Sequence, residues 1–339
     1  MTEYTFVNEI NELKSVVSEA KLIVTDRNVK KLYGDITDGA YVLPVGETAK
    51  STGVLFDIIK AMHDSGMTRS DTLCAVGGGV VGDVAGLAAA LYMRGIKLVS
   101  VPTTLLAIVD SSIGGKTAVD FDGVKNLVGA FKEPNRIATC FKFIDTLDRR
   151  ERLCGVGEIV KTCMLTSSAF DRLFEFSDDL KSFIDGEDYD ARALKELADI
   201  CIATKREIVE RDPLEHGLRA ILNVGHTVGH ALESVNNYDK SHGEYVMTGM
   251  LAELAMLKEF VDAEFYARVT GLLTTFVRPP KSTANGVLKA ASGDKKNSSD
   301  DICVMLPTKP GDIAEIRIAR DEFKLRYESA IKELKQCTA

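Results

Sequence analysis

Residues 217–244, GLRAILNVGHTVGHALESVNNYDKSHGE, contain three of the five histidines of this 339-residue chain. His226 and His230 are four residues apart in an apolar run typical of a helix, so we expect their side chains on one face. Arg219 and Asn223 precede His226 by seven and three residues, and one continuous helix would bring them to roughly the same face. A polar stripe in such apolar surroundings predicts a functional site.

The same stretch supplies His242 after a turn-like segment, where a loop could carry it back over the polar stripe. Neutral imidazole is a common zinc ligand, and catalytic zinc sites typically have three protein ligands and one open position. Two histidines would then need a carboxylate, and Glu158 in the apolar run 155–165 is the candidate. Lys161 lies one turn further on, so we expect the acid and the amine to be buried and paired. The spacing HxxxH lacks the Glu of the zinc-protease motif, which excludes that class.

The composition is that of a globular protein without a nucleic-acid or anionic-membrane surface. Hydrophobic residues make up 45% and charged residues 27%, and the formal net charge is −8. Seven cysteines without a C-x-x-C pair indicate reduced thiols rather than a disulfide framework. The N-terminus lacks a signal-peptide pattern and no run approaches transmembrane length, so we predict a cytoplasmic protein.

Short apolar runs alternate with helix-length segments in the first half of the chain, as in βαβ units with a largely parallel sheet. Strands are expected at residues 21–26, 41–45, 72–76 and 97–102. Helices are expected at 155–165, 168–177, 191–210, 218–234, 243–262 and 264–276, followed by a hairpin around Pro310 and a helix over 321–336. We therefore predict a Rossmann-like α/β domain over residues 1–150 and a mostly α-helical domain over 151–339.

The glycine-rich segment 77–95, GGGVVGDVAGLAAALYMRG, follows the third expected strand. Gly77, Gly79 and Gly82 satisfy G-x-G-x-x-G, whose backbone N–H groups can approach a pyrophosphate at a helix N-terminus. Asp83 departs from the simplest fingerprint because a carboxylate would repel phosphate unless it serves a ribose hydroxyl or a cofactor amide. A role of the glycines in packing alone is the alternative.

Residues 101–131 form a polar, glycine-punctuated stretch that we expect to be a long functional loop rather than regular helix. Lys116, Lys125 and Asn126 could bind a phosphate or a carboxylate there, and a solvated basic loop is the alternative. Lys205 lies in an expected helix with charged neighbours, so a solvated role is as plausible as a functional one.

Several motifs occur in the order found in 3-dehydroquinate synthases: GGGVVGD, YMRG, VPTTLLAIVDSSIGGKTAVD, KNLVGAF, GEIVK, GLRAILNVGHTVGHA, HGE and DKKN. Over about residues 20–335 the chain resembles this family of the sugar-phosphate cyclase superfamily. The resemblance implies an NAD-binding α/β domain, an α-helical metal- and substrate-binding domain and an active site in the cleft between them. It also implies a homodimeric phosphorus–oxygen lyase of the shikimate pathway, in which chorismate and the aromatic amino acids are made.

The implied reaction converts 3-deoxy-D-arabino-heptulosonate 7-phosphate to 3-dehydroquinate and phosphate. C5 is oxidised transiently by NAD, phosphate leaves by elimination, and C5 is reduced again before the ring opens and an intramolecular aldol step closes the carbocycle. A divalent metal would act as the Lewis acid at the oxidised carbon.

The resemblance implies Glu158, His226 and His242 as the metal ligands, for which zinc and cobalt are both suitable, and it assigns His230 to the substrate. His230 could relay the proton that the leaving phosphate needs. Contacts to the substrate's carboxylate, hydroxyls and phosphate are implied for Lys116, Asn126, Lys161, Lys205, Arg219, Asn223, His230 and Lys296, the last being favoured over Lys295. Arg94 would reach the phosphate from the neighbouring subunit of the homodimer.

The resemblance also implies that NAD contacts residues spread along the first domain. These are Asp26, Asn28, Glu47, Lys50, Gly79, Val80, Val81, Gly82, Asp83, Thr103, Thr104, Lys116, Phe143 and Thr146. Lys125 would lie at the border between cofactor and substrate, and Asp110 near the nicotinamide. Asp145 stands where a Lys is often seen in the family, so the chain departs from the family pattern at this position.

Three alternatives remain open at this point. Cyclases that make 2-deoxy-scyllo-inosose or valiolone share the fold but bind no substrate carboxylate, so they would not need so many cations. Metal-dependent polyol dehydrogenases share the glycine-rich turn but have no reason for the GGK…KN segment. A purely structural metal would need a closed site with four ligands.

Overall fold

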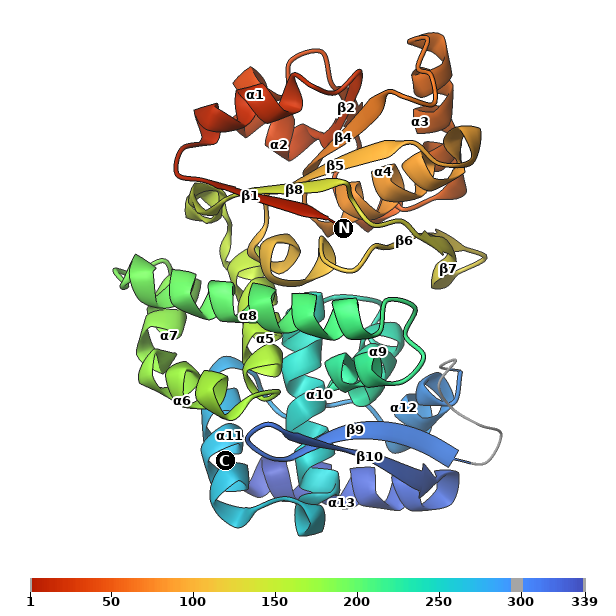
Figure 1. Ribbon diagram of the computed structural model, residues 1–339. Coiled ribbons are helices and arrows are strands. Elements are labelled where there is room, and N and C mark those ends of the chain that lie inside the picture. Colours follow the sequence, from red (N-terminus) through yellow and green to blue (C-terminus); the bar gives the residue numbers. More distant parts are fainter. Residues whose placement is uncertain (1, 294–300, 338–339) are drawn as a thin grey trace. The chain divides into compact units, whose positions relative to one another are not determined.

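The computed structural model describes residues 2–293 and 301–337 (Figure 1). The chain forms two compact units, Met1–Leu147 and Asp148–Ala339. Among the described helices, none combines the length and the apolar character that a membrane span requires. The predicted fold class, an α/β unit followed by a mostly helical unit, is confirmed.

The first unit is built on a six-stranded parallel sheet with strand order β1-β8-β5-β4-β2-β3 (Figure 1). Its strands are β1 (Glu3–Val7), β2 (Leu22–Asp26), β3 (Tyr41–Leu43), β4 (Thr72–Gly77), β5 (Lys97–Pro102) and β8 (Arg136–Cys140). Its helices are α1 (Leu13–Val17), α2 (Arg27–Leu32), α3 (Thr52–Asp64) and α4 (Gly79–Leu91). The four expected strands are present, whereas β1 and β8 were not foreseen.

Both faces of this sheet are covered, as the alternation of side chains along β4 shows. Leu73 and Ala75 belong to the core shared with α3 and α4. Cys74 and Val76 point the other way, into the core shared with α1 and α2. Because consecutive residues serve opposite cores, all four of these side chains are apolar and buried, as expected of a central parallel strand.

The prediction of a long loop over residues 101–131 is wrong in part. A π-helical turn, Ala107–Ser111, is followed by an antiparallel hairpin of β6 (Lys116–Phe121) and β7 (Val124–Phe131). Asp122 and Gly123 join the strands, and both have positive φ (51° and 75°), as a tight two-residue hairpin turn requires. The Asp-Gly pair was therefore a readable hairpin signal within this polar stretch.

The second unit is mostly helical. Its helices are α5 (Arg149–Cys163), α6 (Ser167–Glu175), α7 (Ser177–Asp185), α8 (Ala191–Arg211), α9 (His226–Val235), α10 (His242–Met256), α11 (Ala263–Phe276), α12 (Ala284–Ala291) and α13 (Arg320–Cys337). An antiparallel pair, β9 (Asp301–Lys309) and β10 (Asp312–Ala319), forms the expected hairpin. Helices α7 and α12 were not predicted, and α5 begins earlier than expected.

Two expected helices are interrupted. The run 218–234 consists of a 3-10 segment, Leu218–Asn223, and α9, with left-handed Gly225 (φ 75°) between them. Arg219 and Asn223 therefore do not lie on the helical face of the two histidines of α9, and that prediction is wrong. The run 243–262 likewise ends as α10 at Met256 and continues in a short 3-10 turn.

Helix α10 is the centre of the second unit, packed by α5, α9, α11 and α13 (Figure 1). Two of these contacts bring backbones together at glycines. A Cβ atom added to Gly157 of α5 would lie 2.3 Å from the Gly243 carbonyl oxygen of α10. A Cβ atom on Gly249 of α10 would lie 2.1 Å from the Gly225 carbonyl oxygen at the start of α9. These helices can approach so closely only because no side chain intervenes.

Replacing Gly157 with Ala should therefore destabilise the second unit, although Ala is the better helix former. The added methyl meets backbone, which cannot rotate away, and overpacking of this kind typically costs about 1 to 3 kcal/mol. Urea unfolding followed by circular dichroism at 222 nm measures the change. Gly271→Ala in α11 is the matched control, because a Cβ there meets nothing within 4 Å; we expect it to be neutral or stabilising. Equal stability of both variants would contradict the close packing of α5 on α10.

Candidate active site

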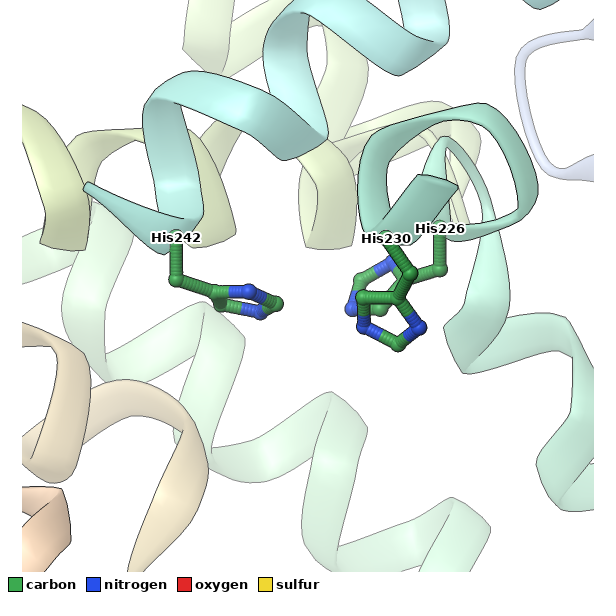
Figure 2. Close-up of side chains that lie close together, drawn as sticks. All are labelled: His226, His230 and His242. Carbon is green, nitrogen blue, oxygen red and sulfur yellow. The ribbon is translucent and has the colours of Figure 1, made fainter. Parts of the chain in front are cut away.

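Three histidines of the second unit converge on one point. Figure 2 shows His226 and His230 on α9 and His242 at the start of α10, with their rings turned toward one another. Their candidate ligand nitrogens all lie within 4.8 Å of one another. The ring centroids are 4.9 Å apart for His226 and His230 and 5.3 Å apart for His226 and His242. A cluster this tight suits a cation bound by imidazole nitrogen.

The predicted carboxylate lies in the same place. Glu158 of α5 is 1% exposed, and its Oε1 atom lies 3.4 Å from Nε2 of His242 and 3.9 Å from Nε2 of His226. It pairs with Lys161 one turn on, as predicted. Among the described residues, neither of its oxygens accepts a hydrogen bond of ordinary geometry. The donor set therefore fits a divalent metal, and His230 adds one imidazole to the three predicted ligands.

The charges of the cluster are set by burial and by the neighbouring groups. Burial raises the pKa of Glu158, but Lys161 and His242 outweigh it and hold that pKa well below its usual value. Burial, together with Lys161 and the neighbouring histidines, lowers the pKa of His226 far below normal. The carboxylate is therefore ionised and the His226 imidazole neutral, which are the forms that bind metal.

Each of the two predicted histidine ligands is oriented by a second contact. Nδ1 of His226 lies 3.0 Å from the carbonyl oxygen of Val224. Nδ1 of His242 lies 3.3 Å from Oε1 of the buried Glu233, on α9. Nε2 of each ring is thus left to face Glu158, the arrangement that outer-shell partners give to metal-binding histidines. Glu233 was not among the predicted site residues, although its position three residues after His230 places it on the same side of α9.

The second unit also contains buried cationic side chains. Lys161, Lys205 and Arg219 are all buried, so the solvated alternative for Lys205 is wrong. Nη1 of Arg219 donates to the carbonyl oxygen of Pro213 at 3.1 Å. The amide of Asn223 donates to the carbonyl oxygen of Ala220 at 3.1 Å. Three of the predicted substrate contacts are therefore cationic side chains inside the second unit.

Asp212 organises the loop that carries Arg219, and the sequence analysis missed it. Its Oδ1 accepts the backbone N–H of His216 at 2.7 Å, and its Oδ2 accepts those of Gly217 and Arg219 at 2.9 Å each. Hydrogen bonds from the Arg219 and His216 backbones lower the pKa of Asp212 to about 2. The signal in the sequence was an acid at the end of a helix before a glycine-containing turn.

In the first unit, the glycine-rich turn joins β4 to α4 as predicted. The helix begins at Gly79 after Gly78, and a cavity beside it is lined by Gly82, Asp83 and Lys116. The unpaired N–H groups of a helix N-terminus make such a turn a ready site for a pyrophosphate. Gly77 must remain small, because an added Cβ would lie 2.5 Å from the Val81 side chain.

Asp83 belongs to a charge network with Lys50. Nζ of Lys50 donates to Oδ2 of Asp83 at 2.7 Å and also to Oδ1 of Asn126. Burial raises the pKa of Asp83, although Lys50 opposes this shift. Glu47 pairs with Lys125 at 3.3 Å. The negative charge of Asp83, which would repel a phosphate, is therefore balanced by Lys50.

Other predicted cofactor residues lie at the carboxyl ends of neighbouring parallel strands, where α/β proteins bind nucleotides. Asp26 ends β2 and accepts the N–H groups of Asn28 and Val29. Thr103 follows β5, and its N–H donates to the Gly77 carbonyl oxygen at 3.0 Å. Val80 and Val81 lie in the first turn of α4, and Oγ1 of Thr104 accepts the N–H of Ala107 at 3.2 Å.

The remaining predicted positions have different environments. Phe143 is buried in the core of the first unit, in an edge-to-face contact with Tyr33, and Thr146 bonds the Tyr33 hydroxyl at 2.6 Å. Asp110 lies in the π-helical turn, a distortion often found at functional sites. Arg94 is exposed in a left-handed conformation. Lys295 and Lys296 lie outside the described residues.

Comparisons with known proteins agree with this geometry. The family model for the 3-dehydroquinate synthase N-terminal domain matches residues 40–154, and that for the C-terminal domain matches residues 155–297. A 3-dehydroquinate synthase of Alkaliphilus metalliredigens is 37% identical over 323 residues, which cover 89% of this chain and 87% of the relative.

Two solved structures share the fold at 24% sequence identity. One is a 2-epi-5-epi-valiolone synthase from Streptomyces hygroscopicus with NAD+ and Zn2+ bound (TM-score 0.85, covering 98% of this chain and 97% of that one). The other is a 2-deoxy-scyllo-inosose synthase complexed with carbaglucose-6-phosphate, NAD+ and Co2+ (TM-score 0.82, 96% of each chain). With both family models matched across most of its length, the chain belongs to the 3-dehydroquinate synthase family.

Proposed function

We propose that this protein is a 3-dehydroquinate synthase that releases phosphate from 3-deoxy-D-arabino-heptulosonate 7-phosphate and closes the carbocycle of 3-dehydroquinate. The observation that carries the proposal is the meeting of Glu158 with His226 and His242, where the buried Lys161 pairs with Glu158. NAD and a divalent metal, zinc or cobalt, are the proposed cofactors. Both kinds of cofactor are bound in the solved cyclases that share the fold.

We propose Glu158, His226 and His242 as the metal ligands and His230 as a substrate contact. When bound, the metal supplies a Lewis acid and NAD a reversible hydride acceptor. Lys161 and Lys205 contribute positive charge for the substrate carboxylate and a developing oxyanion. Arg219 is suited to bidentate binding of a carboxylate or phosphate. His230 relays a proton, since imidazole changes charge near neutral pH.

The phosphate is proposed to contact Asn223 in the second unit and Lys116 and Asn126 in the first. NAD is proposed to bind along the glycine-rich turn and the strand ends, with Asp83 oriented by Lys50. The second unit contains three buried cations, which match a substrate that bears both a carboxylate and a phosphate. This match favours assignment as the synthase over assignment as an inosose or valiolone cyclase. These cyclases are the second candidates, since they share the fold.

We further propose a cytoplasmic homodimer in which Arg94 reaches the phosphate of the neighbouring subunit. Leu91 and Met93, beside Arg94, are about half exposed, at 48% and 46%, which leaves apolar surface for a partner. Met93 and Arg94 both have positive φ, 48° and 65°, a conformation that non-glycine residues rarely adopt without a functional reason. No disulfide joins the six buried cysteines Cys74, Cys140, Cys154, Cys163, Cys201 and Cys303, as expected in a reducing compartment.

The direct test mixes the purified protein with the heptulosonate 7-phosphate and NAD, with and without a chelator. We expect phosphate release that the chelator abolishes, 3-dehydroquinate as the organic product, and no net NADH. Product identification by mass spectrometry separates this activity from that of the sibling cyclases. A metal-replete, NAD-binding protein that releases no phosphate from this substrate would move the assignment to a cyclase of phosphorylated hexoses or heptuloses.

His226→Ala should abolish metal binding and turnover while NAD affinity is retained, because one of three proposed ligands is lost. The metal content after dialysis measures the loss of metal binding, and equilibrium binding of NAD measures the retained NAD affinity. His63→Ala is the control, since His63 lies exposed on α3 and should be without effect. Full activity of the His226 variant would refute the metal assignment.

Lys50→Met should weaken NAD binding about tenfold, the effect of losing about 1.4 kcal/mol, because it leaves the buried Asp83 without its cation. Equilibrium dialysis with NAD gives the dissociation constant. Lys60→Met is the control, because it removes an exposed lysine that pairs with Asp64 on α3. It should leave the dissociation constant for NAD unchanged. Unaltered NAD binding by the Lys50 variant would exclude the network from the cofactor site.

A further inference from the structure

A second buried carboxylate contacts the helix that carries two of the clustered histidines. Glu253 of α10 is 1% exposed. Its Oε2 accepts the backbone N–H of Gly225 at 3.0 Å, and its Oε1 accepts that of Val228 at 2.8 Å. These two N–H groups bracket His226, which begins α9. One side chain thus holds the backbone on both sides of a proposed ligand.

The bonds replace a cap that α9 does not carry itself. The first N–H groups of a helix have no partner within the helix, and a side chain of the N-cap residue commonly accepts one of them. The N-cap residue of α9 is Gly225, which has no side chain. Glu253 performs this function from another helix, and its negative charge is also favourable at the positive end of the helix dipole.

The same side chain links α9 to the other histidine-bearing helix. His242 begins α10, and Glu253 lies eleven residues further along it, about three turns. The backbones are already in contact near Glu253, because a Cβ atom on Gly249 would lie 2.6 Å from the Gly229 amide nitrogen. A change at Glu253 should therefore shift the start of α9 relative to α10. Such a shift would change the distance between His226 and His242.

We propose that Glu253 is a positioning residue for the metal centre, which holds His226 in register with His242 and Glu158. It acts through its backbone hydrogen bonds to the start of α9. This inference rests on the proposed metal site. In Glu253→Gln, one oxygen becomes an NH2 group that faces a backbone N–H, so one bond is lost and two donors oppose each other.

Zinc affinity, measured by competition with a chromogenic chelator, tests the proposal without reference to turnover. We expect Glu253→Gln to lower it about 10- to 100-fold, the usual effect of losing an outer-shell partner. Asp262→Asn is the matched control, because Asp262 caps α11, which carries none of the proposed ligands, by accepting the Phe265 N–H at 2.9 Å. Its zinc affinity should stay within about twofold of the wild type.

The visible spectrum of the cobalt-substituted protein distinguishes positioning from general destabilisation. A displaced His226 should change the d–d bands of the Glu253 variant, whereas the Asp262 variant should keep the wild-type spectrum. If Glu253→Gln does not fold, Glu253→Asp, which keeps the charge on a shorter arm, takes its place with the same readouts. Wild-type zinc affinity and an unchanged cobalt spectrum in a folded Glu253 variant would overturn the proposal. A wild-type protein that binds no zinc would instead refute the metal site itself.

Discussion

The close approach of helices α5 and α9 to α10 is the constraint on which the candidate site depends. Gly157 meets the Gly243 carbonyl, and Gly249 meets the Gly225 carbonyl, at separations that leave no room for a Cβ atom. Glu158 follows the first of these glycines on α5, and His242 precedes Gly243 on α10. A wider helix spacing would separate the carboxylate from the imidazoles. The residues that allow the close packing are therefore direct neighbours of the residues of the candidate site.

Such a site has to keep charged groups buried. Glu158 remains ionised despite burial because Lys161 lies against it, while His226 is kept neutral by burial and by the neighbouring cations. The supporting contacts are also polar and buried, with Glu233 on His242 and Glu253 on the start of α9. The arrangement of the centre therefore depends on Lys161, Glu233 and Glu253 as well as on the proposed ligands.

The first unit also has to balance the charge of a carboxylate in its candidate site, and it does so with different structural elements. Its glycine-rich turn presents backbone N–H groups at the start of α4, and the acid that follows is balanced by Lys50 from the segment preceding α3. The hairpin of β6 and β7 adds Asn126, whose N–H donates to Asp120 at 2.9 Å and whose conformation has positive φ. The hairpin thus belongs to the same polar network as the turn, which makes its folded form part of the proposed cofactor site.

Local patterns in the sequence were sufficient for the alternating α/β unit, the helical unit, the glycine-rich turn and the i, i+4 spacing of His226 and His230. These features depend on backbone hydrogen bonding and side-chain periodicity between near neighbours. The break at Gly225, which separates Arg219 and Asn223 from the histidine helix, was not predicted, because the apolar periodicity runs through this glycine and does not show that it adopts a left-handed conformation against α10. Only the tertiary structure revealed that Glu233 contacts His242 and that Glu253 caps the start of α9. In both cases the two partners lie on different helices, α9 and α10, and the packing of these helices, which no local periodicity encodes, brings them together.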